Sequence, residues 1–243
     1  MNIMRPFNTC ITALMVCAAV TVSHAAYADI VISGTRVIYP ASAKDVTVKM
    51  ENRGNKPLLV QTWLDDGRDT TNPQELKLPF IVTPPVSRVD PAKGQTVRIT
   101  WLGQPLPTDR ERLYWFNVLE VPPKAKASEE NQNMLQLAFR TRIKMFFRPD
   151  GLKGDPAIAA AQLKWSQQAN ELVAKNDSPF YVSVAKIETT VGGKNIEIEP
   201  HVVAPFTSQS FSLKPGDSAR ITKLTYTSIN DFGGAEKHDA PVN

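Results

Sequence analysis

Short runs in which apolar and polar residues alternate dominate the chain from residue 29 onward, and this period of two predicts β-strands. The runs are rich in Val, Ile, Thr and aromatic residues, and clusters of Pro, Gly, Asn and Asp separate them. Seven strands in roughly 120 residues leave no room for helical crossovers, so the first half favours an antiparallel sandwich of the immunoglobulin type. These predicted strands are Ile30–Tyr39, Asp45–Asn52, Leu58–Asp65, Phe80–Thr83, Gln95–Leu102, Leu113–Val121 and Met134–Arg148.

The segment Pro149–Pro156 interrupts the pattern, because the two prolines and two glycines within it are typical of a linker. We therefore predict an all-β protein of two immunoglobulin-like β-sandwich domains, over residues 29–148 and 157–243, joined by a linker over residues 149–156. The strands predicted in the second domain are Glu171–Lys175, Phe180–Glu188, Ile196–Val203, Gln209–Leu213 and Ala219–Ser228.

Two parts of the second domain carry weaker patterns. The alanine-rich run at 157–161 favours a short helix, so the secondary structure of Pro156–Asn170 stays open. The last segment, Ala235–Asn243, is polar, and we expect it to be loosely ordered.

The predicted strand Met134–Arg148 is unusually long, against a typical strand of about 5–6 residues. Its odd positions are mostly apolar, and they include Leu135, Leu137, Phe139 and Ile143. Two interpretations remain: a core strand that bends between the domains, or an edge whose first half is offered to another chain. Exposed apolar edges are normally suppressed because they promote aggregation, so an open edge would indicate that pairing is its purpose.

The first 28 residues have the three parts of a secretory signal peptide. Arg5 precedes an apolar stretch from Cys10 to Val22, and Ala26-Tyr27-Ala28 is an A-x-A cleavage site. The apolar stretch is too short to span about 30 Å of hydrocarbon as a helix. Cleavage near Ala28 removes both cysteines, which excludes thiol catalysis and zinc–thiolate sites from the exported chain.

The remaining composition offers little support for catalysis or nucleic-acid binding. The formal net charge of +4 comes from interspersed residues and contains no polybasic tract. His201 and His238 are the only histidines after the signal segment, and no nucleophile–base or metal-ligand pattern accompanies them. We therefore expect no enzymatic activity, no metal, no cofactor and no nucleic-acid partner.

One segment, 106–123, resembles the signature of the periplasmic pilus-assembly chaperones of the chaperone–usher pathway, the PapD-like family. It reads Leu-Pro-Thr-Asp-Arg-Glu-Arg-Leu-Tyr-Trp-Phe-Asn-Val-Leu-Glu-Val-Pro-Pro. Further matches to this family run in order along the chain, at Thr35–Pro40, Gln61–Leu64, Pro84–Arg88, Ile143–Pro149 and Ile229–Gly234.

The resemblance implies two immunoglobulin-like domains at an angle, with a cleft between them. A pilus subunit lacks its last strand, and the chaperone lends it the strand matching Met134–Ile143. Leu135, Leu137, Phe139 and Ile143 would then fill the groove of the subunit. The resemblance also gives roles to charged residues: Arg36 and Lys144 anchor the C-terminal carboxylate of the subunit, and an interdomain ion-pair network joins Glu111, Arg148 and Asp231.

The same resemblance implies a periplasmic protein of a Gram-negative bacterium that binds subunits one to one and docks on an outer-membrane usher. The short polar segment Lys124–Asn133 resembles the branch of the family with a short loop at this point. Self-association through the exposed strand is a further expectation for the free protein. The alternative is an immunoglobulin-like structural or adhesive subunit of a surface fibre, although residues from Asp29 onward run directly into the first strand without a donor peptide.

Overall fold

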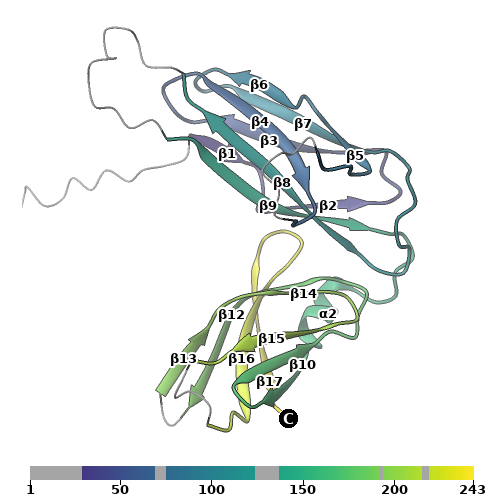
Figure 1. Ribbon diagram of the computed structural model, residues 1–243, viewed down its shortest axis with the longest axis vertical. Helices are drawn as coiled ribbons and strands as arrows, with labels where there is room; N and C mark the ends of the chain where they lie inside the picture. The colour runs from purple at the N-terminus through teal and green to yellow at the C-terminus, as the bar shows by residue number, and fades with distance from the viewer. Residues whose placement is uncertain (1–28, 69–74, 124–136, 192–193, 215–218) are drawn as a thin grey trace, which may run out of the picture.

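The computed structural model describes residues 29–68, 75–123, 137–191, 194–214 and 219–243. These residues form two β-sandwiches that lie end to end in Figure 1, with one short helix, α2, in the second sandwich. The predicted all-β architecture with two sandwich domains is confirmed. No helix among the described residues has the length and apolar character needed to cross a membrane.

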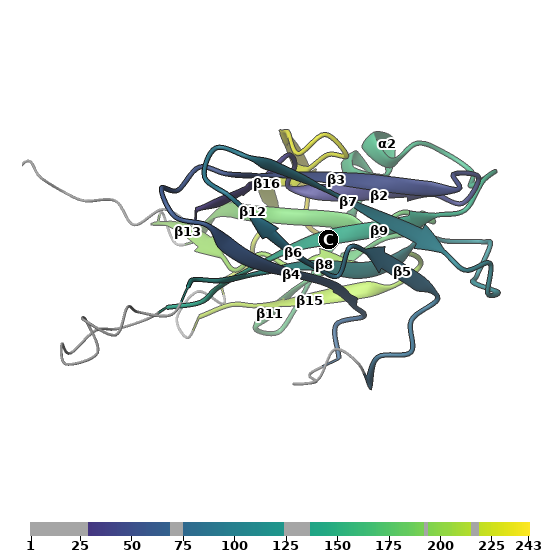
Figure 2. The same cartoon turned by 90° about the horizontal axis from the view of Figure 1, so that it is seen from above.

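The first sandwich consists of two sheets with strand orders β1-β3-β7-β5 and β2-β9-β8-β4-β6. Seen from above in Figure 2, β3 and β7 of the first sheet lie on one side of β4 and β8 of the second. The strands are β1 (Ile30–Ile32), β2 (Arg36–Pro40), β3 (Asp45–Asn52), β4 (Leu58–Asp65), β5 (Phe80–Thr83), β6 (Val86–Val89), β7 (Gly94–Trp101), β8 (Arg112–Val121) and β9 (Phe139–Arg148).

Alternate side chains of these strands fill the space between the two sheets, as the period of two predicts. In β8, Tyr114, Phe116 and Val118 are almost fully buried, and the aromatic rings of Tyr39 and Phe147 meet at a centroid distance of 5.7 Å in the same core. This core holds β8 and β9 in a fixed register and so positions the residues on their outer face.

The prediction of one strand over Ile30–Tyr39 was wrong, because the chain changes sheets within it. β1 pairs with β3, whereas β2 runs parallel to β9 in the other sheet. Ser33 and Gly34 lie at the break between the two strands.

Strand β9 has a neighbour along nearly its whole length on one side but along only half of it on the other. β8 pairs with Phe139–Phe147, whereas β2 pairs only with Lys144–Arg148. Among the described residues, the edge of Phe139–Ile143 that faces away from β8 therefore has no neighbouring strand.

The second sandwich has one sheet of order β10-β11-β15 and one of order β13-β12-β16-β17, with β14 pairing to β12. Its core includes Trp165 and Phe211, whose ring centroids lie 5.3 Å apart. The elements are α2 (Pro156–Ala161), β10 (Lys164–Gln168), β11 (Glu171–Lys175), β12 (Val182–Val191), β13 (Lys194–Ile198), β14 (Val202–Val203), β15 (Ser208–Ser212), β16 (Lys223–Ile229) and β17 (Ala235–Pro241).

The segment left open by the sequence forms α2 and β10. The carboxylate of Asp155 accepts hydrogen bonds from the amides of Ala157 and Ile158, and Pro156 occupies the first turn, so the helix start follows ordinary capping rules. The expectation that Ala235–Asn243 is loosely ordered was wrong. β17 pairs with β16 over seven residues, and Val242 is buried in the core, so pairing and burial outweigh a weak strand propensity.

Candidate functional site

Arg36 on β2 and Lys144 on β9 lie side by side at the junction of the two domains. They are direct Cα partners in the parallel pairing of the two strands, so their side chains leave the same face of the sheet. The guanidinium of Arg36 also reaches the second domain, where Nη1 donates a hydrogen bond of 2.8 Å to the carbonyl of Ile229.

Neither cation is neutralised by an acidic side chain in the ion pairs found among the described residues. Nε of Arg36 is buried and has no hydrogen-bond acceptor in this part of the chain. Nζ of Lys144 lies 5.2 Å from the centre of the Trp115 ring, whose face attracts a cation only weakly. A half-buried pair of like charges without a bonded counter-ion would attract an anion.

Burial is the main cause of the lowered pKa of both groups. Burial lowers the pKa of Lys144, and the nearby charge of Arg36 lowers it further. Burial also lowers the pKa of Arg36, although Asp231 acts in the opposite direction. An anion placed between these two groups would therefore be favoured by both.

The three residues assigned to an interdomain network do lie together. Nε of Arg148 is 2.6 Å from Oε1 of Glu111, and the two Nη atoms donate to Asp231 at 2.7 and 3.0 Å. Glu111 is 1% exposed, and its other oxygen accepts a hydrogen bond of 2.7 Å from the backbone amide of Tyr181 in the second domain. Burial would lower the pKa of Arg148, but Asp231 and Glu111 outweigh it and raise the pKa.

The hairpin between β16 and β17, drawn in yellow in Figure 1, brings Asp231 to the first domain. The side chain of Asn230 fixes the turn by accepting hydrogen bonds from the amides of Phe232 and Gly234. Gly233 has φ +85°, and a Cβ there would come within 2.5 Å of Oγ1 of Thr35, so only glycine fits this contact. Phe232, at the tip, is 97% exposed.

The apolar row predicted on the long strand is partly described. Leu137 and Phe139 are 54% and 43% exposed, whereas Ile143 packs against the core of the first domain. Leu135 lies outside the described residues, as does Lys124–Asn133. Exposure therefore increases along the row from Ile143 to Leu137, away from the domain junction.

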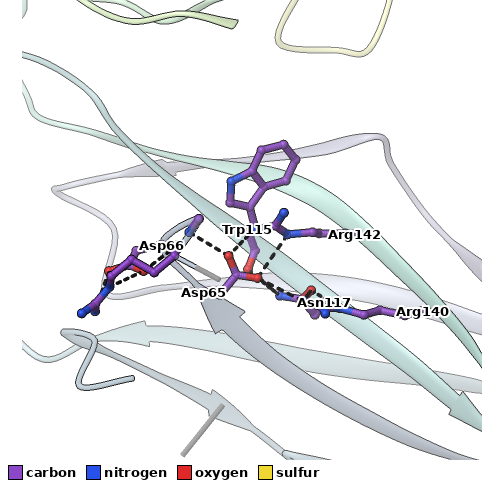
Figure 3. Close-up of polar contacts among 8 residues, drawn as sticks. Asp65, Asp66, Trp115, Asn117, Arg140 and Arg142 are labelled. Carbon is purple, nitrogen blue, oxygen red and sulfur yellow. Dashed lines mark hydrogen bonds and ion pairs between the residues drawn. The ribbon is translucent and has the colours of Figure 1, made fainter. Parts of the chain in front are cut away.

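A polar cluster on the outer face of β4, β8 and β9 was not foreseen from the sequence (Figure 3). Asp65 is buried, and both Arg140 and Arg142 pair with it, while the amide of Asn117 donates to its Oδ2 at 2.8 Å. The guanidinium of Arg142 also lies 4.3 Å from the centre of the Trp115 ring.

This cluster fixes the outward-facing side chains of the first half of β9. Burial would raise the pKa of Asp65, but hydrogen bonds from Arg142, Asn117 and the amide of Gly67 outweigh it, so the pKa lies below its ordinary value. The alternation on β9 placed Arg140 and Arg142 on one face. Their partner on β4 is distant in sequence and carries no local signal.

An open strand edge with exposed apolar side chains, beside two uncompensated cations, defines a protein that can bind another chain by strand addition. Two protein-family models match: "Pili and flagellar-assembly chaperone, PapD N-terminal domain" over residues 29–153, and "Pili assembly chaperone PapD, C-terminal domain" over residues 158–240. The chain belongs to the PapD family of pili-assembly chaperones, whose domains are immunoglobulin-like sandwiches.

The relatives are similar over nearly their whole length. The chain is 47% identical to the probable fimbrial chaperone YadV of Escherichia coli strain K12, covering 94% of this chain and 96% of YadV. It is 44% identical to the chaperone protein FimB/FhaD of Bordetella pertussis, covering 96% of each.

Solved structures give the same picture. A crystal structure of the YadV chaperone aligns with a TM-score of 0.76 and 45% identity, over 88% of this chain and 100% of that one. A structure of the Salmonella enterica SafA pilin in complex with the SafB chaperone aligns with a TM-score of 0.74 and 31% identity, over 89% of this chain and 98% of that one.

Proposed function

We propose that this protein is a chaperone that binds folding pilus subunits one to one, completes them with a strand of its own and delivers them for assembly. The observation that carries the proposal is the open edge of Phe139–Ile143 next to Arg36 and Lys144. The SafA–SafB complex supports it, since the chaperone there is bound to a pilin.

Strand addition accounts for the exposed half of β9. Main-chain hydrogen bonds along the open edge supply affinity, and alternate side chains enter the groove of the partner. Leu137 and Phe139 are exposed in the free protein, so their burial in a subunit would contribute favourable free energy of about 25 cal/mol per Å² of apolar surface. We assign Leu135 to the same row.

The two cations would anchor the C-terminal carboxylate of the subunit. A carboxylate has two acceptor oxygens, and charge-assisted hydrogen bonds from an ammonium and a guanidinium are short and strong. Removing one cation would leave a partly buried carboxylate unpaired, at a cost of about 2–5 kcal/mol in binding. The anchor would also set the register of the added strand, because Lys144 is part of β9.

The network of Glu111, Arg148 and Asp231 would hold the two domains at the angle that the bound subunit requires. Arg148 lies four residues, or two strand repeats, after Lys144 on the same outward face of β9, so the network and the anchor share one strand. The network would then set the interdomain angle as well as stabilise the folded protein.

Export to the periplasm, with cleavage after Ala28, completes the proposal. We also propose that the loaded chaperone docks on an outer-membrane usher and that the free protein self-associates through β9. The proposed domain limits are 29–148 and 157–243, and we assign the protein to the short-loop branch of the family.

A pull-down tests the proposal. Tagged protein is recovered from periplasm that co-expresses candidate subunits, and it is compared with Lys144→Ala and with Lys49→Ala, an exposed strand lysine that serves as the matched control. We expect a 1:1 complex with the native chain and the control, and at least a tenfold loss with Lys144→Ala.

The other outcomes separate the parts of the proposal. Equal recovery with Lys144→Ala would refute the anchor but leave the chaperone role. If the protein instead appears in purified fibres and captures no subunit, the alternative of a fibre subunit is correct.

A further inference from the structure

Glu120 is a buried acid in the core of the first domain, remote from the cations of the domain junction. It occupies an inward-facing position of β8 together with Phe116 and Val118, and it is 3% exposed. A carboxylate in such a place is costly unless a positive charge or several donors accompany it.

The donors available to Glu120 come from the start of the described chain. Oε2 accepts hydrogen bonds from the backbone amides of Asp29 and Ile30 at 3.2 and 3.3 Å, which are long for such bonds. Oε1 is buried and has no donor among the described residues. None of the ion pairs in this part of the chain includes Glu120.

The charge balance around this carboxylate is therefore incomplete. Burial raises the pKa of Glu120, the amides of Ile30 and Asp29 lower it, and the carboxylate of Asp29 raises it again. The missing component is a cation with more than one N–H, close to the nitrogen of Asp29.

Signal-peptide cleavage would create that cation. Hydrolysis of the bond between Ala28 and Asp29 adds one water, leaves a carboxylate on Ala28 and turns the amide nitrogen of Asp29 into an α-ammonium. This nitrogen is the atom that already lies 3.2 Å from Oε2. An ammonium has three donors, so it can serve both oxygens of one carboxylate.

We propose that Glu120 is the binding site for the α-ammonium of Asp29 and that removal of the signal peptide completes a buried ion pair which stabilises the mature first domain. The proposal rests on cleavage after Ala28 and goes beyond the binding of subunits.

The position of the pair gives it a structural consequence. Glu120 is the register partner of Phe139, the first residue of β9, and Asp29 leads directly into β1 of the opposite sheet. The pair would therefore fasten the two sheets together at the point where the exposed strand enters the sandwich. The precursor, whose Asp29 carries only an amide, would keep the hydrogen bond to Oε2 but lack the ion pair.

The first test establishes the N-terminus. The intact mass of the protein recovered from the periplasm is expected to match a chain that begins at Asp29, and any other first residue would overturn the proposal.

The second test is a double-mutant cycle, in which the N-terminus and the side chain at position 120 are changed separately and together and the melting temperature is measured. Chains that begin at Asp29 are compared with chains that carry a neutral Gly-Ser-Gly extension, each with Glu120 and with Glu120→Gln. With Glu120, we expect the extension to lower the melting temperature by at least about 5 °C. With Glu120→Gln, the difference should vanish. Glu51→Gln, a half-exposed acid on the neighbouring strand β3, should retain the full difference.

A third measurement needs no variant. The pKa of the α-amino group of the mature chain, followed by NMR, is expected to lie at least about one unit above its ordinary value of about 7.7–8.0. An ordinary value, or an extension effect that persists in Glu120→Gln, would overturn the proposal without bearing on subunit binding.

Discussion

At the scale of single residues, the half-buried cations at the junction fall into two groups. Arg148 forms ion pairs with the carboxylates of Glu111 and Asp231, whereas neither Arg36 nor Lys144 forms an ion pair among the described residues, although the charge of Asp231 acts on Arg36 from a distance. A half-buried charge without an ion-pair partner opposes folding, and the proposed carboxylate anchor would offset this cost in the complex.

This difference predicts the behaviour of Lys144→Met. The lowered pKa means that the folded state disfavours the charged lysine, so removing the charge at neutral pH should keep or raise the melting temperature while subunit capture is lost. The gain should be present below the lowered pKa and disappear as the pH rises toward the ordinary lysine value of about 10.4. Calorimetry across pH, with Lys49→Met as control, checks this. A clear loss of stability in Lys144→Met would contradict it.

The sequence predicted the apolar row of the exposed strand from its alternation, but the charged residues of the candidate site only from family motifs. Arg36 and Lys144 were named in this way, as were the network residues, and the structure places each group together. The contacts of Asp65 with Arg142 and of Glu120 with Asp29 were not predictable, because they join positions far apart in the chain and depend on register.

At the scale of elements, β9 performs two tasks within one strand. Its second half pairs with β2 on one edge and β8 on the other, and its first half pairs with β8 alone. The outer face of that first half is held by Asp65, so the strand is presented in a defined orientation. A preformed strand loses less entropy on binding than a disordered one.

We therefore expect Leu137→Glu to abolish subunit capture without unfolding the chaperone. Leu137 is 54% exposed, so the substitution costs the free protein little, but it places a charge in the apolar groove of a bound subunit. Leu102→Glu, at a site of 47% exposure outside the strand, is the matched control. Co-purification with subunits measures capture, and melting curves measure the stability of the free chaperone. Equal losses in both variants would point to a general effect of charge.

The last strand shows where pattern reasoning failed. β17 lacks the β-branched and aromatic residues that usually mark a strand, yet it pairs with β16 from Lys223 to Ile229. The long-range partner, and the burial of Val242 beyond the end of β17, determine its structure. The strands of both cores were easier to predict, because their alternation follows directly from a two-sided sandwich.

This assignment predicts the effect of Val242→Ala. If the end of the chain is part of the second core, removing two buried methyl groups should lower the free energy of unfolding by about 1–3 kcal/mol. Val31→Ala, at a site of 36% exposure, should change it by less than about 0.5 kcal/mol. Denaturant titration measures both, and an effect of Val242→Ala no larger than that of the control would mean that the end is not packed.

At the scale of the whole molecule, the two sandwiches are connected by more than the linker. The amide of Glu111 donates to the carbonyl of Pro179, its side chain accepts from Tyr181, and Arg148 reaches Asp231 on the hairpin of the second domain. Polar groups of both domains thus meet at the junction.

Arg148→Ala should loosen this arrangement. It leaves Glu111 buried without its cation, so we expect a loss of about 3 kcal/mol in stability and a broader distribution of interdomain distances in small-angle X-ray scattering. Arg88→Ala removes an exposed ion pair with Asp90 and should leave the scattering unchanged. A native scattering profile in Arg148→Ala would show that the network does not set the angle.

The unpaired cations at the junction also bear on how this protein can be engineered. A selection that scores only the thermal stability of the free protein should favour replacing Lys144, because burial and the charge of Arg36 both disfavour its charged form. Libraries sorted in this way should accumulate thermally stable variants that no longer bind a pilus subunit. If the proposed anchor is correct, selections carried out in the presence of a subunit should instead retain both cations, because the carboxylate of the subunit would supply the counter-ion.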